Sequence, residues 1–436
     1  MKAMESEPTV SVGIVRAKSI TVDLVGSFES KTPRRTFRHG IVASIADGHI
    51  SIDGAPADDL VLTPSGDTCR FVVHDVEIGI GFHWDKHENQ SFGGALRFVA
   101  DGDMLWAVNV VGVERYLESV ISSEMSATSD EELLKAHAVT SRSWLMAQIL
   151  GKGKFQGEQK NETATEITTW RDREDHALFD VCADDHCQRY QGLGRVTNPK
   201  VAKAVEATRG MVLTYDSEVC DARFSKCCGG MTERFESCWA DDPHPYLRPV
   251  TDAMMPPRGL PTDLTTEDAA REWIEASPDA FCNTSDATTL RQVLNDYDQP
   301  TADFFRWETT ISRRELGHLV HTKSGRDLGD IKTLEPLRRG ASGRITRLRI
   351  VGEKGELTVG KELEIRRLLS PTHLYSSAFV SRPSDDGDAL TLRGAGWGHG
   401  VGLCQIGAAV MSRRGFGYRS ILYHYFRRAQ IERLWE

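Results

Sequence analysis

The hydrophobic pattern of this chain changes its period near residue 112, and this change limits the possible folds more than any other feature. Before it, short β-branched runs are separated by turns such as Asp47-Gly48, which predicts strands. After it, apolar residues recur every three or four positions, which predicts helices. The strands are expected at Val10–Val15, Ile20–Val25, Ile41–Ile45, Phe71–Val76 and Leu105–Val111. The first hundred residues should therefore form a small antiparallel sheet or barrel.

Two helices are predicted directly after these strands. The first covers 113–125, where the apolar residues have helical spacing. The second covers 129–151 and starts with the capping-box pattern Ser129-x-x-Glu132. The polar stretch 152–173 is expected to be a loop.

The rest of the chain changes character once more, at 253–335. This stretch opens with two prolines and contains helical patterns at 267–276, 289–297 and 313–320, so it is predicted to be a helical insertion or lid. We therefore predict a mixed α+β protein with three parts. They are a β-rich N-terminal domain at 1–100, a core formed by 101–252 and 336–436, and the insertion at 253–335.

Charge and hydropathy argue against two classes of partner. The chain has 53 Lys and Arg against 63 Asp and Glu, a net charge of −10, so it has no overall attraction for nucleic acid or anionic lipid. No run approaches the roughly 18 apolar residues of a membrane span. The stretch from Met1 to Ser6 lacks the apolar core of a secretory signal.

Glu124 is the first candidate for chemistry. It follows a hydroxyl pair at the break between the two helices, where Met125 can keep its carboxyl group partly dry and favour the protonated form. Arg142, on the second helix, can reach a carboxylate or an anionic substrate group. Spacing alone favours the simpler alternative, in which Glu124 caps a helix and Arg142 is solvated.

The glycine-rich segment Gly394-Ala-Gly-Trp-Gly-His-Gly-Val-Gly402 is the second candidate. Alternating glycines allow the backbone to approach another group closely, and Trp397 could stack on a sugar while His399 orients it. The segment lacks the spacing of a dinucleotide-binding loop. A tight loop packed under its own tryptophan explains the pattern equally well.

Cysteines and histidines gather in the middle of the chain. The pattern His176-x5-Cys182-x4-Cys187 offers thiolate and imidazole ligands that suit tetrahedral zinc. The adjacent His186 leaves open which imidazole would bind. A disulfide between Cys182 and Cys187, or from one of them to a cysteine in 220–238, is the alternative, and the odd total of nine leaves at least one thiol unpaired.

Four stretches carry motifs in a fixed order along the chain. They are Tyr116-Leu-Glu-Ser-Val-Ile-Ser-Ser-Glu-Met125 with Glu132-Leu-Leu-Lys-Ala-His-Ala-Val-Thr-Ser-Arg142, residues 180–192, residues 224–236, and Gly396-Trp-Gly-His-Gly-Val-Gly-Leu-Cys-Gln-Ile-Gly-Ala408. Together they resemble the stage II sporulation protein D family (SpoIID/LytB). The vicinal pair Cys227-Cys228 departs from the Ser- and Gly-rich stretch of many relatives.

The resemblance implies a cell-wall enzyme with a catalytic core. Members are lytic transglycosylases that cut denuded peptidoglycan strands between N-acetylmuramic acid and N-acetylglucosamine, and others are described as enhancers of wall amidases. The family's catalytic glutamate corresponds to Glu124 and its supporting arginine to Arg142. The zinc ion of some members corresponds to His176, Cys182 and Cys187.

The same resemblance predicts the partners and the location. Peptidoglycan glycan is the expected substrate, a wall amidase is the alternative partner, and the location is the cell envelope, periplasmic or extracytoplasmic. The native gene product is expected to carry an export signal that this chain lacks. The residues expected to contact substrate are Ser123, Tyr190, Ser225, Lys226, Trp397, His399 and Gln405.

Overall fold

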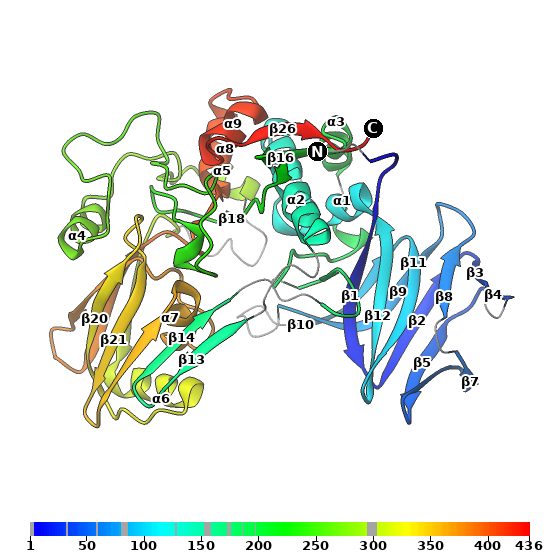
Figure 1. The fold of residues 1–436 in the computed structure, drawn as a ribbon, viewed down its shortest axis with the longest axis horizontal. Coiled ribbons are helices and arrows are strands. Elements are labelled where there is room, and N and C mark those ends of the chain that lie inside the picture. Colours follow the sequence, from blue (N-terminus) through cyan, green and yellow to red (C-terminus); the bar gives the residue numbers. More distant parts are fainter. Residues whose placement is uncertain are drawn as a thin grey trace. The chain divides into compact units, whose positions relative to one another are not determined.

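The computed structural model shows two compact units, each formed by more than one stretch of the chain. One comprises 1–153, 175–212 and 432–436, and the other 154–174 and 213–431 (Figure 1). Both contain helices and sheets, so the predicted α+β class is confirmed. The described residues are 4–31, 34–57, 60–79, 86–126, 129–151, 158–171, 176–184, 186–196, 198–293 and 303–436.

The described residues of the first unit form two sheets. Its strands are β1 (Thr9–Ala17), β2 (Ser19–Val25), β3 (Phe28–Lys31), β4 (Arg34–Phe37), β5 (Ile41–Ala46), β6 (His49–Ile52), β7 (Ala55–Pro56), β8 (Val61–Pro64), β9 (Arg70–Ile78), β10 (Lys86–Phe92), β11 (Ala95–Asp101), β12 (Met104–Gly112) and β15 (Val181–Cys182). The seven-stranded sheet has the order β15-β1-β12-β11-β8-β3-β4, and the six-stranded sheet the order β10-β9-β2-β5-β6-β7. All the strands predicted for this region are present.

Alternation of side chains explains the strands. In β2, Ile20, Val22 and Leu24 are buried while the residues between them are exposed, as the period of two requires. The predicted last strand, Leu105–Val111, is part of β12, which pairs along the whole of β1, and β15 adds to β1 in parallel. The pairing with β15 brings a segment from much later in the sequence to the edge of the N-terminal sheet.

Three α-helices complete the first unit: α1 (Val113–Glu124), α2 (Glu131–Leu150) and α3 (Pro199–Ala207), with a 3-10 turn, η1 (Leu193–Arg195). The face of α1 predicted to be apolar is buried. The capping-box prediction is wrong by one residue, because the N-cap of α2 is Asp130. The hydroxyl of Ser129 instead donates to the Ser126 carbonyl at 2.7 Å.

Three more sheets are formed within the part of the second unit that the structure describes. Its strands are β13 (Gln159–Glu162), β14 (Glu166–Trp170), β17 (Glu218–Val219), β18 (Phe224–Ser225), β19 (Arg306–Ser312), β20 (Ile331–Arg339), β21 (Ile345–Gly352), β22 (Glu356–Gly360), β23 (Phe379–Pro383), β24 (Ala389–Ala395) and β25 (Leu403–Cys404). The sheets have the orders β13-β14-β22-β21-β20, β19-β24-β23 and β18-β25. Strands β16 (Met211–Tyr215) and β26 (Gln430–Arg433) include residues of both units.

The loop predicted for 152–173 is wrong where β13 and β14 form a hairpin. Strand β14 pairs in parallel with β22, with Ile167 opposite Val359. This partner lies almost two hundred residues later, so the local polarity of the stretch did not indicate a strand.

The helices of the second unit are α4 (Glu267–Ala276), α5 (Ala287–Val293), α6 (Arg313–Ser324), α7 (Glu362–Leu368), α8 (Gln405–Arg413) and α9 (Tyr418–Tyr425), with a 3-10 turn, η2 (Phe235–Ser237). The helices predicted at 267–276 and 313–320 are confirmed. The one predicted at 289–297 is present to residue 293, and its end lies outside the described residues. The stretch 253–335 is not purely helical, because β19 lies within it and pairs with β24.

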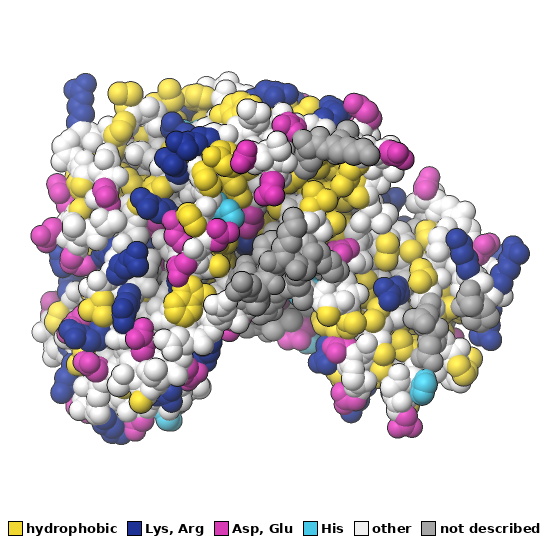
Figure 2. All heavy atoms as spheres, viewed as in Figure 1, with side chains coloured by type: hydrophobic (Ala, Val, Ile, Leu, Met, Phe, Trp, Pro, Cys, Tyr) yellow, Lys and Arg dark blue, Asp and Glu magenta, His cyan; other side chains and the backbone are white. Residues whose placement is uncertain are grey.

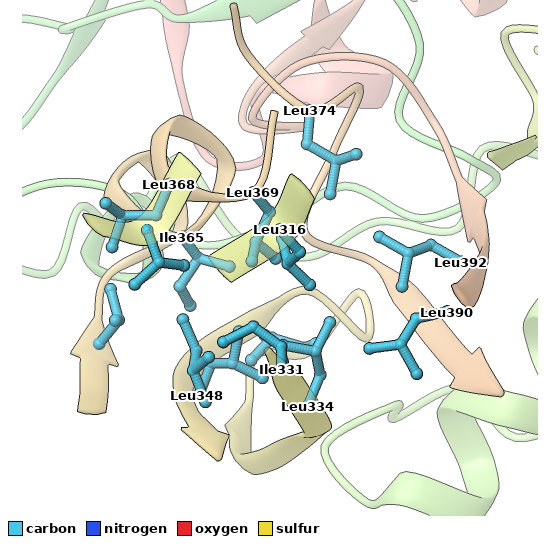
Figure 3. Close-up of a cluster of buried hydrophobic side chains, with 14 of the residues drawn as sticks. Leu316, Ile331, Leu334, Leu348, Ile365, Leu368, Leu369, Leu374, Leu390 and Leu392 are labelled. Carbon is cyan, nitrogen blue, oxygen red and sulfur yellow. The ribbon is translucent and has the colours of Figure 1, made fainter. Parts of the chain in front are cut away.

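A leucine-rich core fixes the start of the glycine-rich segment. In Figure 3, Leu390 and Leu392 of β24 point toward the same interior as Leu316 of α6 and Leu348 of β21, and all four are buried. Residues 396–402 follow β24 directly. The packing of β24 therefore determines where this segment leaves the sheet.

The charge pattern agrees with the composition. On the face shown in Figure 2, Lys and Arg side chains lie among Asp and Glu side chains and form no large patch of one sign. Among the described residues, none of the helices has both the length and the apolar content needed to cross a bilayer.

Candidate functional site

Glu124 is the last residue of α1, and its side chain is half-buried. Its Oε1 accepts a hydrogen bond from the backbone N–H of Arg189 at 3.2 Å. Met125, which follows it, is 1% exposed and supplies the apolar wall that the sequence predicts. The carboxyl group is therefore oriented by a backbone donor from a different segment of the chain.

Arg142 is fully buried and paired with a different carboxylate, Glu114 at the start of α1. Its Nε donates to Glu114 Oε1 at 3.1 Å and its Nη2 to Oε2 at 2.5 Å. A further bond runs to the Met211 carbonyl at 3.0 Å. Glu114 also accepts from the Gly210 N–H and the Trp435 indole, at 3.0 and 3.1 Å. The pair thus joins both helices to the C-terminal residues of the unit.

This pairing separates Arg142 from Glu124. Glu114 and Glu124 lie ten residues apart on α1, and a rise of about 1.5 Å per residue places them about 15 Å apart along the axis. Arg142 is therefore held at the opposite end of α1 from the candidate acid. Its position in the structure is that of a residue that stabilises the helix pair.

Four ligand atoms meet in the loop next to Glu124. His176, Cys182, His186 and Cys187 each contribute one, and these atoms all lie within 4.8 Å of one another. The sequence left the choice of imidazole open, and the structure brings both into the cluster. All nine cysteines of the chain are free thiols, so the disulfide alternative is not formed here.

The spacing of these atoms fits a tetrahedral metal ion. Bonds of about 2.3 Å to sulfur and 2.05 Å to nitrogen imply S···N edges of about 3.6 Å. Cys187 Sγ lies 3.4 Å from His176 Nε2 and 3.5 Å from His186 Nδ1, and Cys182 Sγ lies 3.8 Å from His186 Nδ1. A hydrogen bond with Cys187 lowers the pKa of Cys182 to about 2, which favours the thiolate that binds metal.

The cluster and Glu124 share one neighbourhood. Burial raises the pKa of Tyr116 well above its usual value, and the charges of Cys187, Cys182 and Glu124 add to this effect. Arg189, whose N–H holds Glu124, comes two residues after Cys187. Any ligand that orders the cluster therefore also orders the donor to the carboxyl group.

Two residues predicted to contact substrate lie in the interior of the first unit. Tyr190 is 3% exposed, donates its hydroxyl to Asn109 Oδ1 at 2.5 Å, and stacks on Tyr116 with centroids 5.0 Å apart. Ser123 is 2% exposed and its hydroxyl donates to the Ser119 carbonyl at 2.8 Å. Both positions serve packing rather than a surface that a glycan could reach.

The glycine-rich segment packs against the protein itself. Gly396, Gly398, Gly400 and Gly402 all have positive φ, between 74° and 94°. A Cβ at Gly402 would lie 2.0 Å from the Arg223 carbonyl oxygen, and one at Gly400 would lie 2.4 Å from Cζ of Arg344. The close approach expected from the sequence is therefore explained by protein atoms.

Arg344 has a central place beneath this segment. It is fully buried and donates to the Gly398 carbonyl at 3.0 Å and to the Ser342 hydroxyl at 2.9 Å. The same hydroxyl donates to Glu233 Oε2 at 2.6 Å. This network was missed by sequence reasoning, because its members are far apart in the chain and belong to no motif.

Substituting a glycine of this segment should destabilise the second unit. Gly400→Ala adds both the strain of a positive φ, about 1 kcal/mol, and a clash with Arg344 that costs about 1–3 kcal/mol more. Gly387→Ala is the matched control, because φ there is +79° but nothing lies within 4 Å of the added Cβ. Thermal unfolding should show a clearly larger decrease in melting temperature for Gly400→Ala than for Gly387→Ala. Equal decreases would contradict the packing of this segment.

The other predicted residues of the second unit surround this segment. Trp397 is half-buried beside Tyr375 and Phe304, with centroids 4.4 and 4.7 Å away. His399 accepts the Val401 N–H at Nδ1, and burial, followed by the charge of Arg223, lowers its pKa well below the usual value. The histidine is therefore neutral.

Ser225, Lys226 and Gln405 complete the predicted set. Lys226 donates to the Val293 carbonyl at 3.0 Å, and Gln405, 2% exposed, is the first residue of α8. The Oγ of Ser225 is buried, with no hydrogen-bond partner among the described residues. Of the three, Ser225 is thus the one with unused hydrogen-bonding capacity.

Comparisons with known proteins place these features in a family. Residues 101–215 match the family model of the stage II sporulation protein, and residues 233–402 match a domain of unknown function (DUF8618). Glu124 and the Cys/His cluster lie in the first match, and the whole glycine-rich segment, 394–402, lies in the second.

Similar proteins are found in two genera. Stage II sporulation protein D of Bacillus subtilis is 25% identical over 74% of this chain and 76% of its own length. An uncharacterised protein of Brachyspira hyodysenteriae is 27% identical over 78% of this chain and 71% of its own. The amidase enhancer of Bacillus subtilis is 25% identical over 71% of this chain, but only 39% of its own length is covered. The domain match and these relatives agree with the ordered motifs: residues 101–215 form a domain of the stage II sporulation protein (SpoIID) family, and about three quarters of the chain is similar to stage II sporulation protein D.

Proposed function

We propose that this protein is a lytic transglycosylase that cleaves denuded peptidoglycan strands between N-acetylmuramic acid and N-acetylglucosamine, leaving 1,6-anhydro ends. The observation that carries the proposal is the half-buried Glu124 carboxyl group, held by a backbone N–H within the SpoIID domain. The SpoIID domain supports a cell-wall role, and the similarity to an amidase enhancer supports the same setting.

One carboxyl group is sufficient for this reaction. Most glycoside hydrolases use two, one to protonate the leaving oxygen and one to attack or to activate water. Here Glu124 protonates the glycosidic oxygen as its bond to C1 breaks. The C6 hydroxyl of the same muramic residue then bonds to C1 and gives its proton to the Glu124 carboxylate. Because the nucleophile is tethered to the substrate, proximity supplies much of the acceleration, and no water is consumed.

We also propose that His176, Cys182, His186 and Cys187 hold a zinc ion. Four protein ligands make a closed site, which is typical of structural rather than catalytic zinc. The ion would hold the four side chains of the loop together. The Glu124 carboxyl group is positioned by the chain itself, because Arg189 follows this loop and its backbone N–H donates to Glu124.

Removing the metal ligands should reduce activity without abolishing it. Loss of groups that orient an active-site residue typically costs about 10- to 100-fold. We expect a decrease of this size for Cys182→Ser/Cys187→Ser, measured as the rate of glycan cleavage by folded protein. Cys69→Ser is the control, because that thiol is in the same unit but outside the cluster. Full activity of the double variant would argue against an ordering role.

The proposal is tested with stem-peptide-free glycan and the wild-type protein. Mass spectrometry of the products should show 1,6-anhydromuramic ends that are absent after treatment with Glu124→Gln protein. Absence of such ends with the wild type, or equal yields from both, would reject the assignment.

The second candidate is a non-catalytic glycan-binding enhancer of a wall amidase. A hollow in the second unit favours it, since its lining includes Arg248, Arg427 and Arg428 beside the exposed Met254. Guanidinium groups suit the carboxylates of muramic acid. An enhancer should stimulate a purified amidase equally well with Glu124→Gln, whereas a transglycosylase should not produce cleavage in that form.

A further inference from the structure

A second group of ligand atoms lies inside the second unit, apart from every residue used above. Cys228, Asp252, Cys282 and Cys404 each contribute one atom, and these atoms all lie within 4.8 Å of one another. The four side chains are at most 3% exposed. They come from separate segments: the turn after β18, residues 250–252, the segment after α4, and the start of α8.

The distances suit a metal ion better than a covalent bridge. Cys228 Sγ and Cys282 Sγ are 3.6 Å apart, close to the edge of about 3.8 Å expected for two sulfurs bound at about 2.3 Å in a tetrahedron. A disulfide would need about 2.05 Å. Both cysteines, like Cys404, are free thiols.

Hydrogen bonds hold the candidate ligand atoms in place, as they do around known metal ligands. Asp252 Oδ1 accepts from the Tyr425 hydroxyl at 2.6 Å, and Oδ2 accepts from the Cys282 N–H at 2.9 Å. Cys404 Sγ accepts from the Cys228 N–H at 3.2 Å. Cys404 is also the N-cap of α8, where the helix dipole favours a thiolate.

The charges of the cluster call for a cation. A buried carboxylate is costly unless it is paired or bound to metal, and Asp252 is fully buried. The thiol of Cys404 is also fully buried, within 4.8 Å of the Asp252 carboxyl oxygen. A divalent ion would stabilise the ionised form of both groups.

A neighbouring histidine points to the same place. Nε2 of His424 lies 3.9 Å from Asp252 Oδ1 and is buried with no hydrogen-bond partner among the described residues. An unpartnered buried nitrogen beside a buried carboxylate is an independent sign that a polar ligand belongs here.

We infer that Cys228, Asp252, Cys282 and Cys404 form a closed structural site for a thiophilic divalent cation of the zinc class. Four protein ligands leave no open position for substrate, so the ion would serve folding rather than chemistry. It would join the 253–335 stretch, through Cys282, to the strand and helix that flank the glycine-rich segment. The site is independent of Glu124 and of the Cys/His cluster.

The test measures metal content in a background that lacks the first cluster. Cys182→Ser/Cys187→Ser protein, purified without chelators, should retain about one equivalent of zinc per chain. Zinc is measured by inductively coupled plasma mass spectrometry. Adding Cys228→Ala/Cys282→Ala should reduce this at least tenfold. Adding Cys220→Ala instead should change nothing, because Cys220 is a buried thiol of the same unit outside the site.

A second measurement covers the case in which the Cys228→Ala/Cys282→Ala change prevents folding. X-ray absorption at the zinc edge of the background protein should show sulfur and oxygen neighbours in a three-to-one ratio. A background protein without metal, an unchanged zinc content after the second pair of substitutions, or a native Cys228–Cys282 disulfide found by peptide mapping would overturn the proposal. Because no glycan is involved, these outcomes are separate from the fate of the transglycosylase assignment.

Discussion

Glu124→Gln protein should cleave denuded glycan about two to four orders of magnitude more slowly than the wild type. Glutamine keeps the size of the side chain and can still accept the Arg189 N–H at its amide oxygen, but it can neither donate a proton to the leaving oxygen nor take one back. Losses of this size are typical when a general acid or base is removed. The measurement is the initial rate at which soluble glycan fragments are released from the denuded glycan.

The matched control is Glu118→Gln on the same helix. Glu118 lies six residues before Glu124 on the same helix, and burial raises its pKa, so the substitution makes the same chemical change in a similar setting. Its rate should stay within about twofold of the wild type. Equal losses in both variants would indicate damage to α1 rather than to a catalytic group.

Arg142→Met should lower the free energy of unfolding of the first unit by about 3–5 kcal/mol. The substitution leaves Glu114 buried without its cation, and breaking a buried ion pair from one side carries a cost of this order. Loss of about 10 °C or more in the melting temperature should follow. Arg16→Met is the control, because the Arg16–Asp101 pair is about 40% exposed, and exposed pairs contribute at most about 1 kcal/mol.

The double variant Arg142→Met/Glu114→Leu separates stability from catalysis. Replacing both partners by apolar groups removes the unpaired charge and should recover much of the lost stability. If Arg142 acts only by holding the helices, the specific activity of the folded double variant should also recover. A stable but inactive double variant would restore to Arg142 the supporting catalytic role that the family resemblance implies.

Local patterns were sufficient to predict the strands of the first unit and both of its long helices. The alternation in Ile20–Val25 and the helical spacing in α1 depend only on which face of each element is buried, and a single stretch of sequence shows this. The position of Glu124 at the end of α1 follows from the same pattern. The Cys/His cluster was also predictable, because its four residues all lie within 176–187.

Contacts between distant segments were not predictable in this way. The partner of Arg142 is Glu114 rather than Glu124, and only the packing of the two helices decides between them. Strand β14 forms because β22 is available to pair with it. The second group of ligand atoms collects Cys228, Cys282 and Cys404 from segments that no motif connects.

The most direct test of the central claim is to run the wild-type reaction on denuded glycan in water enriched in oxygen-18. Because the muramic C6 hydroxyl is the nucleophile in the proposed mechanism, the new ends should be 1,6-anhydro sugars that carry no label. Reducing ends with one labelled oxygen would show that water is the nucleophile and that the protein is a hydrolase. An uncut glycan that nevertheless binds the protein would leave the amidase-enhancer function in its place.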